Sequence, residues 1–190
     1  TTKKLDEIRK RIVIQSKSFD DLIELSKRKE DMMVSIPAIM PISNRDLIRT
    51  ASGFGLRVHP IYKIIKFHAG MDFTAPLGTD VYATGNGTIA ETISSKRGLG
   101  NHVIVDHGFG YTTIYAHLDR INVRKGQKVE RGDVIGFVGS TGLSLANHLH
   151  YEVKLNGKNV DPMNYYSNDL TPAQYERMIE IASKTGQSFD

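Results

Sequence analysis

The alternation of short β-rich runs with glycine constrains the fold of this chain more than any other feature. From residue 50 onward, runs rich in Val, Ile, Thr and Tyr are interrupted by glycines. The turn signals recur about every 8 to 12 residues, a spacing typical of antiparallel sandwiches and barrel-like sheets. We therefore expect a mainly β, antiparallel domain. Its strands are predicted at residues 81–83, 87–93, 102–106, 111–118, 133–139 and 148–155.

The N-terminal part differs from this domain in composition and in the spacing of its apolar residues. Residues 3–32 are highly charged and contain neither proline nor glycine. Their apolar positions have partly helical spacing, which predicts one helix, or two helices broken near residues 15–19. We expect an amphipathic helix that rests on the domain. A coiled-coil stalk, a dimer contact and a remnant of a longer segment are the alternatives. The apolar positions are Leu5, Ile8, Ile12, Leu22 and Leu25.

The remaining segments complete the predicted organisation. Pro37 and Pro41 favour an extended connector, because the residue before proline avoids helical backbone. A C-terminal helix is predicted from the cap formed by Thr171, Pro172 and Gln174,. We expect its apolar residues Tyr175, Met178, Ile179 and Ala182 to serve packing,. The predicted division is a helical segment (1–36), a connector (37–49), a main β-rich domain (50–166) and a C-terminal helix with a tail (167–190).

Composition narrows the function classes. The chain has no cysteine, which excludes disulfides, thiolate metal sites and a cysteine nucleophile,. A net charge of +4 favours an anionic partner only weakly, and no nucleic-acid-binding signature accompanies it,. No apolar run is long enough to span a bilayer. The chain starts Thr-Thr-Lys-Lys without methionine, so we expect a processed or trimmed fragment, and the sequence leaves open whether an upstream signal or membrane anchor preceded it.

The histidines indicate a metal or acid–base site. All seven lie between residues 59 and 150. In a strand, His148 and His150 project from the same face, about 7 Å apart. His68 and Asp72 follow the same theme at a spacing of four, and His117 adds a fifth candidate. Catalytic zinc takes three protein ligands and leaves one position for water. Three of these five residues can bind the metal, and two remain for proton transfer.

An ordered set of motifs then points to a family. The sequence resembles lysostaphin/LytM-type zinc metallopeptidases over about residues 50 to 165. The matching motifs are Phe54-Gly55-x-Arg57-x-His59-Pro60, His68-x-x-x-Asp72, Tyr115-x-His117-Leu118, Gly139-Ser140-Thr141-Gly142 and His148-x-His150-Tyr151-Glu152.

This resemblance implies a zinc-dependent endopeptidase of the bacterial cell envelope that cleaves peptides of peptidoglycan. It assigns His68, Asp72 and His150 as zinc ligands, and His117 and His148 as the catalytic pair. It also implies an antiparallel β-sheet groove with a barrel-sandwich-like core. The alternative function is a catalytically latent relative that binds the cell wall and activates an amidase. The chain departs from the family pattern at Asp80 and at residues 144–147, which leaves the shape of the groove and the substrate preference open.

Other conspicuous residues have plainer interpretations. We expect His102 and His107 to be structural, and His59 to shape either the groove or a turn. Arg57 suits either a substrate carboxylate or a contact that pins its turn. The glycine-spaced segment 126–136 resembles the hairpins of lipoyl and biotinyl carriers, which present a modified lysine at a tight turn, but no Met-Lys-Met or similar turn appears here. It is therefore predicted to be a β-hairpin of the main sheet.

Overall fold

The computed structural model describes residues 2–43, 49–58, 64–168 and 176, and the chain divides into two compact units, Thr1–Val34 and Ser35–Asp190. The predicted C-terminal helix, with its cap at Thr171, lies outside the described residues apart from Glu176, and so does His59.

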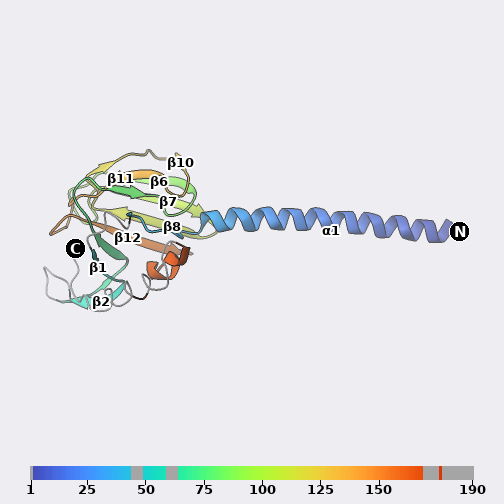
Figure 1. The fold of residues 1–190 in the computed structure, drawn as a ribbon, viewed down its shortest axis with the longest axis horizontal. Helices are drawn as coiled ribbons and strands as arrows, with labels where there is room; N and C mark the ends of the chain where they lie inside the picture. Colours follow the sequence, from blue (N-terminus) through green and yellow to red (C-terminus); the bar gives the residue numbers. More distant parts are fainter. Residues whose placement is uncertain (1, 44–48, 59–63, 169–175, 177–190) are drawn as a thin grey trace. The chain divides into compact units, whose positions relative to one another are not determined.

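The first unit is a single helix. Helix α1 runs without a break from Thr2 to Ser35 (Figure 1), so the sequence forms one helix here and not two. Its large apolar side chains, such as Ile12 and Leu22, are exposed. Among the described residues, no helix is both long and apolar enough to cross a membrane. The role of α1 stays a prediction.

The second unit is built on an antiparallel sheet. Its hydrogen-bonded order is β1-β4-β12-β8-β7-β6-β10, with β13 paired to the outer part of β12. Figure 1 shows this order from β10 at the top, through β6, β7, β8 and β12, to β1. The strands are β1 (Arg49–Ser52), β4 (Met71–Thr74), β12 (His148–Leu155), β8 (Tyr111–Ala116), β7 (His102–Gly108), β6 (Gly87–Ile93), β10 (Lys128–Val129) and β13 (Lys158–Val160).

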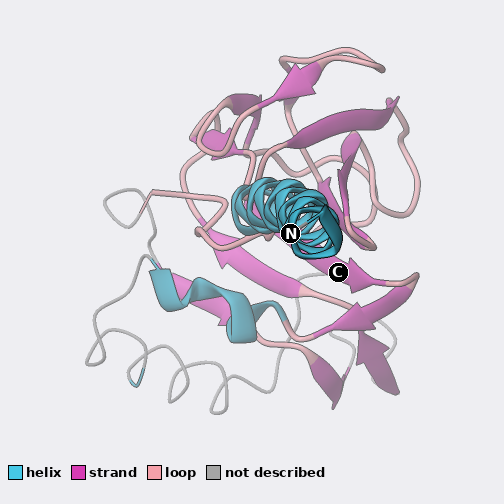
Figure 2. Ribbon diagram, turned by 90° about the vertical axis from the view of Figure 1, so that its right-hand side faces the viewer, coloured by secondary structure: helices cyan, strands magenta, loops and turns pink. Residues whose placement is uncertain are grey.

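Two smaller sheets complete the strands, which Figure 2 shows in magenta. One has the order β5-β11-β9, and the other pairs β2 with β3. Their bounds are β5 (Asp80–Tyr82), β11 (Val134–Phe137), β9 (Arg120–Ile121), β2 (Gly55–Val58) and β3 (Ile65–His68). The predicted mainly β, antiparallel fold is therefore confirmed. Across the described ranges, the main sheet is open, with β1 and β10 at its ends, and it does not close into a barrel.

One strand prediction is wrong. Segment 126–136 is not a hairpin of the main sheet, because β10 joins that sheet beside β6 while β11 joins the three-stranded sheet. The turn between them forms backbone hydrogen bonds with Ala83, which directly follows β5: Gly132 N donates to Ala83 O, and Ala83 N donates to Asp133 O. These hydrogen bonds hold the turn against the C-terminal end of β5, and the chain passes there from the main sheet to the three-stranded sheet.

The core lies on one face of β12. Leu149, Tyr151 and Val153 join the hydrophobic cluster, as expected for alternate residues of a strand. The buried hydroxyl of Tyr151 is satisfied by Thr84 Oγ1 at 2.8 Å. Met40, from the predicted connector, is also part of this cluster. A 3-10 helix, η1 (Pro162–Asn168), adds Tyr166 beside the ring of Phe73.

Candidate metal centre

The opposite face of β12 builds a cluster of imidazoles and carboxylates. The register pairs His150 with Asp72 on β4. His68 ends β3, and only Ala69 and Gly70 separate β3 from β4. His68 Nε2 lies 3.0 Å from Asp72 Oδ1, and His150 Nδ1 lies 2.9 Å from the same oxygen. The two nitrogens are 2.9 Å apart. Sheet pairing therefore brings together ligand atoms that are 82 positions apart in sequence.

The donor set fits a divalent cation. All three side chains are buried, and Asp72 has no exposed surface. Burial by itself would raise the pKa of the Asp72 carboxyl, but the adjacent His68 and His150 rings hold it well below its usual value,. The residue therefore stays an anion. Tetrahedral ligands at about 2.0–2.1 Å from zinc lie about 3.3 Å from one another, close to the separations seen here. This is the one group of such residues with metal-binding spacing in the part of the chain that the structure describes.

Hydrogen bonds decide which nitrogen of each histidine faces the cluster. His68 Nδ1 lies 2.9 Å from the carbonyl oxygen of Gly53, which accepts a hydrogen bond from His68 in the tautomer that is protonated at Nδ1. In that tautomer the Nε2 lone pair of His68 would be available to a cation held between it and Asp72. The Arg57 guanidinium contacts Ser52 Oγ and also packs 2.6 Å from His68 Nδ1. Of the two roles predicted for Arg57, these contacts match the pinning of its turn.

His150 is oriented from its other side by Glu152. Its Nε2 lies 3.2 Å from Glu152 Oε1, which leaves Nδ1 directed at Asp72. Burial raises the pKa of Glu152, but hydrogen bonds from His150 and Asn159 outweigh it, so the pKa is lowered overall. A carboxylate that accepts from the second nitrogen of a histidine is a common outer partner of metal ligands.

His117 and His148 lie side by side next to this cluster. Their ring centroids are 4.7 Å apart, and the His117 ring is 6.0 Å from that of His150. His117 Nδ1 donates to Thr141 O at 2.7 Å, and His148 Nδ1 donates to Ala146 O at 2.8 Å. Both rings are therefore held by Nδ1, with Nε2 left as the atom for proton exchange.

The backbone around the pair is close-packed. His117 has φ of 60°, a left-handed conformation that is costly for a residue other than glycine and often marks functional sites. Gly139 makes this possible, because a Cβ there would lie 2.3 Å from Asp119 N and 2.8 Å from His117 O. Gly139 O also accepts a hydrogen bond from His148 N. The Gly139-Ser140-Thr141-Gly142 motif thus supports both histidines.

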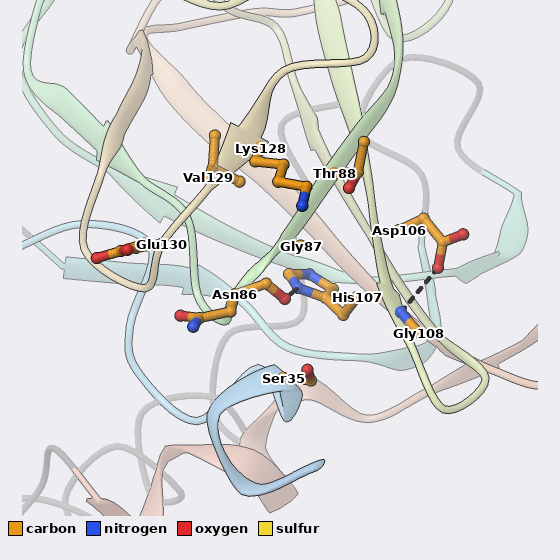
Figure 3. Close-up of a pocket in the computed structure, with 10 residues that line it drawn as sticks. All are labelled: Ser35, Asn86, Gly87, Thr88, Asp106, His107, Gly108, Lys128, Val129 and Glu130. Carbon is orange, nitrogen blue, oxygen red and sulfur yellow. Dashed lines mark hydrogen bonds between the residues drawn. The ribbon is translucent and has the colours of Figure 1, made fainter. Parts of the chain in front are cut away.

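All five predicted site residues lie in this one place, whereas the two histidines expected to be structural lie elsewhere. His102 Nδ1 donates to Gly100 O at 2.8 Å. His107 is buried beside a surface hollow that is lined in part by Asn86, Asp106 and Lys128 (Figure 3). Its Nδ1 donates to Asn86 O, and its Nε2 lies 2.8 Å from Thr113 Oγ1. These bonds engage both ring nitrogens.

Sequence reasoning missed the residues that orient the rings. Glu152 lies in the His148-x-His150-Tyr151-Glu152 motif, and alternation along the strand places it on the face of His148 and His150, but the motif alone indicates no role for it,. Asn159 and Ala146 gave no signal, because their contacts to the site depend on the tertiary fold. A hollow lined by Ser94, Ser95, Lys96, Asn101, Thr141 and Gly142 was also missed. It adjoins His117 through Thr141.

Comparison with known proteins establishes the class. Residues 66–162, just over half of the chain, match the model of peptidase family M23. The chain therefore belongs to peptidase family M23.

Three similar proteins illustrate the match. The peptidoglycan DD-endopeptidase ShyA of Vibrio cholerae is 45% identical over 107 residues, which cover 56% of this chain and 25% of that protein. A zinc-containing peptidase from Vibrio cholerae has 38% identity and a TM-score of 0.59, over 64% of this chain and 37% of that one. The catalytic domain of the antimicrobial peptidase lysostaphin from Staphylococcus simulans has 34% identity and a TM-score of 0.58, over 64% and 92%. The chain spans about a quarter of the length of the curated relatives.

Proposed function

We propose that this chain is a zinc-dependent endopeptidase that hydrolyses peptide bonds of bacterial peptidoglycan, in the stem or the cross-bridge. The observation that carries the proposal is the buried convergence of His68, Asp72 and His150 beside the ring pair of His117 and His148. Membership of a peptidase family supports the reaction. The similarity to ShyA, a peptidoglycan DD-endopeptidase, supports the substrate and a place in the cell envelope.

Zinc is the metal that we assign to the His68–Asp72–His150 cluster. Two imidazoles and one carboxylate, with a position kept for water, form a common catalytic zinc set. The same donors can hold iron, manganese or cobalt, and the likeness to a zinc-containing peptidase favours zinc. When bound, the ion polarises the scissile carbonyl and lowers the pKa of water.

His117 and His148 are the catalytic pair in this proposal. Each ring is anchored by Nδ1 to a backbone carbonyl, so each Nε2 can accept or donate a proton without reorientation of the ring. One histidine acts as general base toward water, and the other stabilises the negative charge that develops on the carbonyl oxygen. The similar anchoring of the two rings suits either assignment.

We also propose the domain division that the sequence predicts, with one refinement at its N-terminal side. The burial of Met40 and Ile42 in the core supports inclusion of the predicted connector in the catalytic domain. The separate compactness of Thr1–Val34 supports a distinct helical segment.

A hydrolysis assay with metal removal tests the function. Purified chain is incubated with peptidoglycan, and new amine termini are quantified before and after zinc is stripped by a chelator. We expect release of amines, its loss on stripping and its return with added zinc. Full activity in protein shown to be free of metal would refute the metal mechanism. Mass analysis of products from peptidoglycans with different cross-bridges then identifies the bond.

The alternative, a latent relative that activates an amidase, has less support. Such a protein does not need a complete ligand set, whereas here all three candidate ligands converge and both neighbouring histidines are present. Stimulation of a purified amidase by the chain, without any release of new amines by the chain alone, would favour it.

A further inference from the structure

One side-chain amide links two segments that carry candidate zinc ligands. Asn159, on β13, donates from Nδ2 to the carbonyl oxygen of Ala69 at 2.9 Å and to Glu152 Oε2 at 2.8 Å. Both partners are acceptors, so the nitrogen of the amide, and not its oxygen, must face them. One hydrogen of the NH₂ group is thereby donated to the β3–β4 turn and the other to a side chain of β12.

The first partner of Asn159 belongs to the turn between two ligands. Ala69 follows His68 directly, and Asp72 comes three residues later on β4. A hydrogen bond to the Ala69 carbonyl therefore fixes the backbone that leads from one ligand to the other. The hairpin between β12 and β13 delivers the amide, because its register places Asn159 opposite Lys154.

The second partner orients the third ligand. Glu152 is nearly buried, with 7% of its surface exposed. It accepts from Asn159 with Oε2 and faces His150 Nε2 with Oε1. Lys154 Nζ lies 3.7 Å from the same Oε2. A carboxylate held in this way accepts the Nε2 proton of His150, which directs the Nδ1 lone pair toward Asp72 and His68.

The close approach of the two segments depends on a missing side chain. A Cβ on Gly70 would lie 2.2 Å from the carbonyl oxygen of Tyr151 and 3.0 Å from Glu152 Cγ. Glycine at this position therefore lets the β3–β4 turn pack directly against β12 beside Glu152.

We propose that Asn159 and Glu152 form a clamp that positions His150 and the His68–Asp72 turn for zinc. We call this pair the Asn159–Glu152 clamp. Both are positioning residues, since they act through His150 and the backbone of Ala69. The inference rests on the proposed zinc site, and it adds a determinant of metal affinity that lies outside the ligands.

Zinc affinity is the direct readout. The full chain is prepared as the wild type, Asn159→Ala, Asn159→Asp and Glu152→Gln. The dissociation constant for Zn²⁺ is measured by competition with a chromogenic chelator. We expect each variant to bind zinc about 10 to 100 times more weakly, the usual cost of losing such an outer partner. Asn159→Asp should be the weaker binder of the two Asn159 variants, because it places a second carboxylate against Glu152 and the Ala69 carbonyl.

Lys158→Ala is the matched control. Lys158 lies on the same short strand, next to Asn159, and is exposed. Its variant should bind zinc like the wild type. Unfolding temperatures measured with the chelator in excess separate metal positioning from general stability. The clamp predicts that the stabilisation by zinc falls more than the stability of the metal-free protein.

Two outcomes would overturn the clamp. One is an unchanged zinc dissociation constant in Asn159→Ala and Glu152→Gln. The other is a lower stability of the metal-free variants with the zinc affinity intact, which would make the contacts merely structural. If Asn159→Ala does not fold, Glu152→Gln alone decides, because it keeps the size of the side chain. Failure of the proposed function looks different, since the wild type itself would then not bind zinc or release amines.

Discussion

At the scale of single residues, His117 is separated from the ligands by its contacts. Its ring faces His148 and is anchored to Thr141 O, and His68, Asp72 and His150 converge without it. We therefore predict that His117→Ala keeps its zinc but loses hydrolysis by about 100-fold or more, the usual range for removal of a general acid or base. Metal content is measured by mass spectrometry, and amine release is measured at saturating zinc.

The ligand variants provide the comparison for this prediction. His68→Ala and Asp72→Ala remove donor atoms, so both should lower the zinc content of the purified protein. Loss of zinc in His117→Ala would contradict the prediction and would show that this histidine is itself a ligand.

Gly139 permits a second prediction at this scale. A methyl group there would meet backbone atoms of Asp119 and His117, and a backbone cannot move aside as a flexible side chain does. Gly139→Ala should therefore lower the free energy of unfolding by about 1–3 kcal/mol and should reduce hydrolysis by displacing His117. Urea unfolding and amine release measure the two effects.

Gly78→Ala is the control for this substitution. Gly78 has φ of 82° and no atom near its Cβ position, so alanine there brings backbone strain of about 1–2 kcal/mol without a clash. Its hydrolysis should match that of the wild type. Equal loss of activity in both variants would show that lower stability, and not displacement of His117, is the cause.

The identity of the site residues was more predictable from the sequence than the orientation and protonation of their rings. Residue spacing left five candidates open, the family resemblance pointed to His68, Asp72 and His150 among them, and the structure brings these three together. The tautomers of the histidines could not be predicted from the sequence, because they depend on acceptors that only the fold supplies, such as Gly53 O for His68 and Ala146 O for His148. The spacing of His68 and Asp72 is thus a local property of the sequence, whereas the approach of His150 to them and the orientation of the rings depend on the tertiary fold.

At the scale of elements, the long strands and even three-residue β5 were predictable, whereas the two-residue strands were not. The bounds of β6 and β12 match the predicted ranges 87–93 and 148–155. β9 and β10 have two residues each, too few for alternation to show. The change of sheets between β10 and β11 also had no local signal, because it depends on the bonds of the turn to Ala83.

Helix α1 leads to the prediction at this scale. All five candidate site residues belong to the unit Ser35–Asp190, and the helix belongs to the other unit. Removal of residues 1–34 should therefore leave the hydrolysis rate within about twofold of that of the full chain, as expected for a site that one domain completes. Rates are compared by amine release at equal zinc content. A rise of tenfold or more on removal would instead show that the helix holds the enzyme latent.

At the scale of the whole molecule, stability depends on pH through a histidine outside the site. Burial lowers the pKa of His107, despite hydrogen bonds that favour its protonation,. In the unfolded chain the same ring takes up a proton near pH 6.5. Below that pH the unfolded state binds more protons than the folded state, so the stability from His107 is present above about pH 6.5 and declines as the pH falls toward the folded pKa.

The measurement compares the wild type with His107→Gln, with a chelator in excess so that zinc release does not contribute. Urea unfolding at pH 8 should show the variant less stable, because it loses the fit of the ring between Asn86 O and Thr113 Oγ1. From pH 7 to pH 5.5 the wild type should lose up to about 1.4 kcal/mol per pH unit more than the variant, the limit for one linked proton. The two stabilities should therefore converge in acid. A difference that stays constant or widens as the pH falls would contradict a buried, neutral His107.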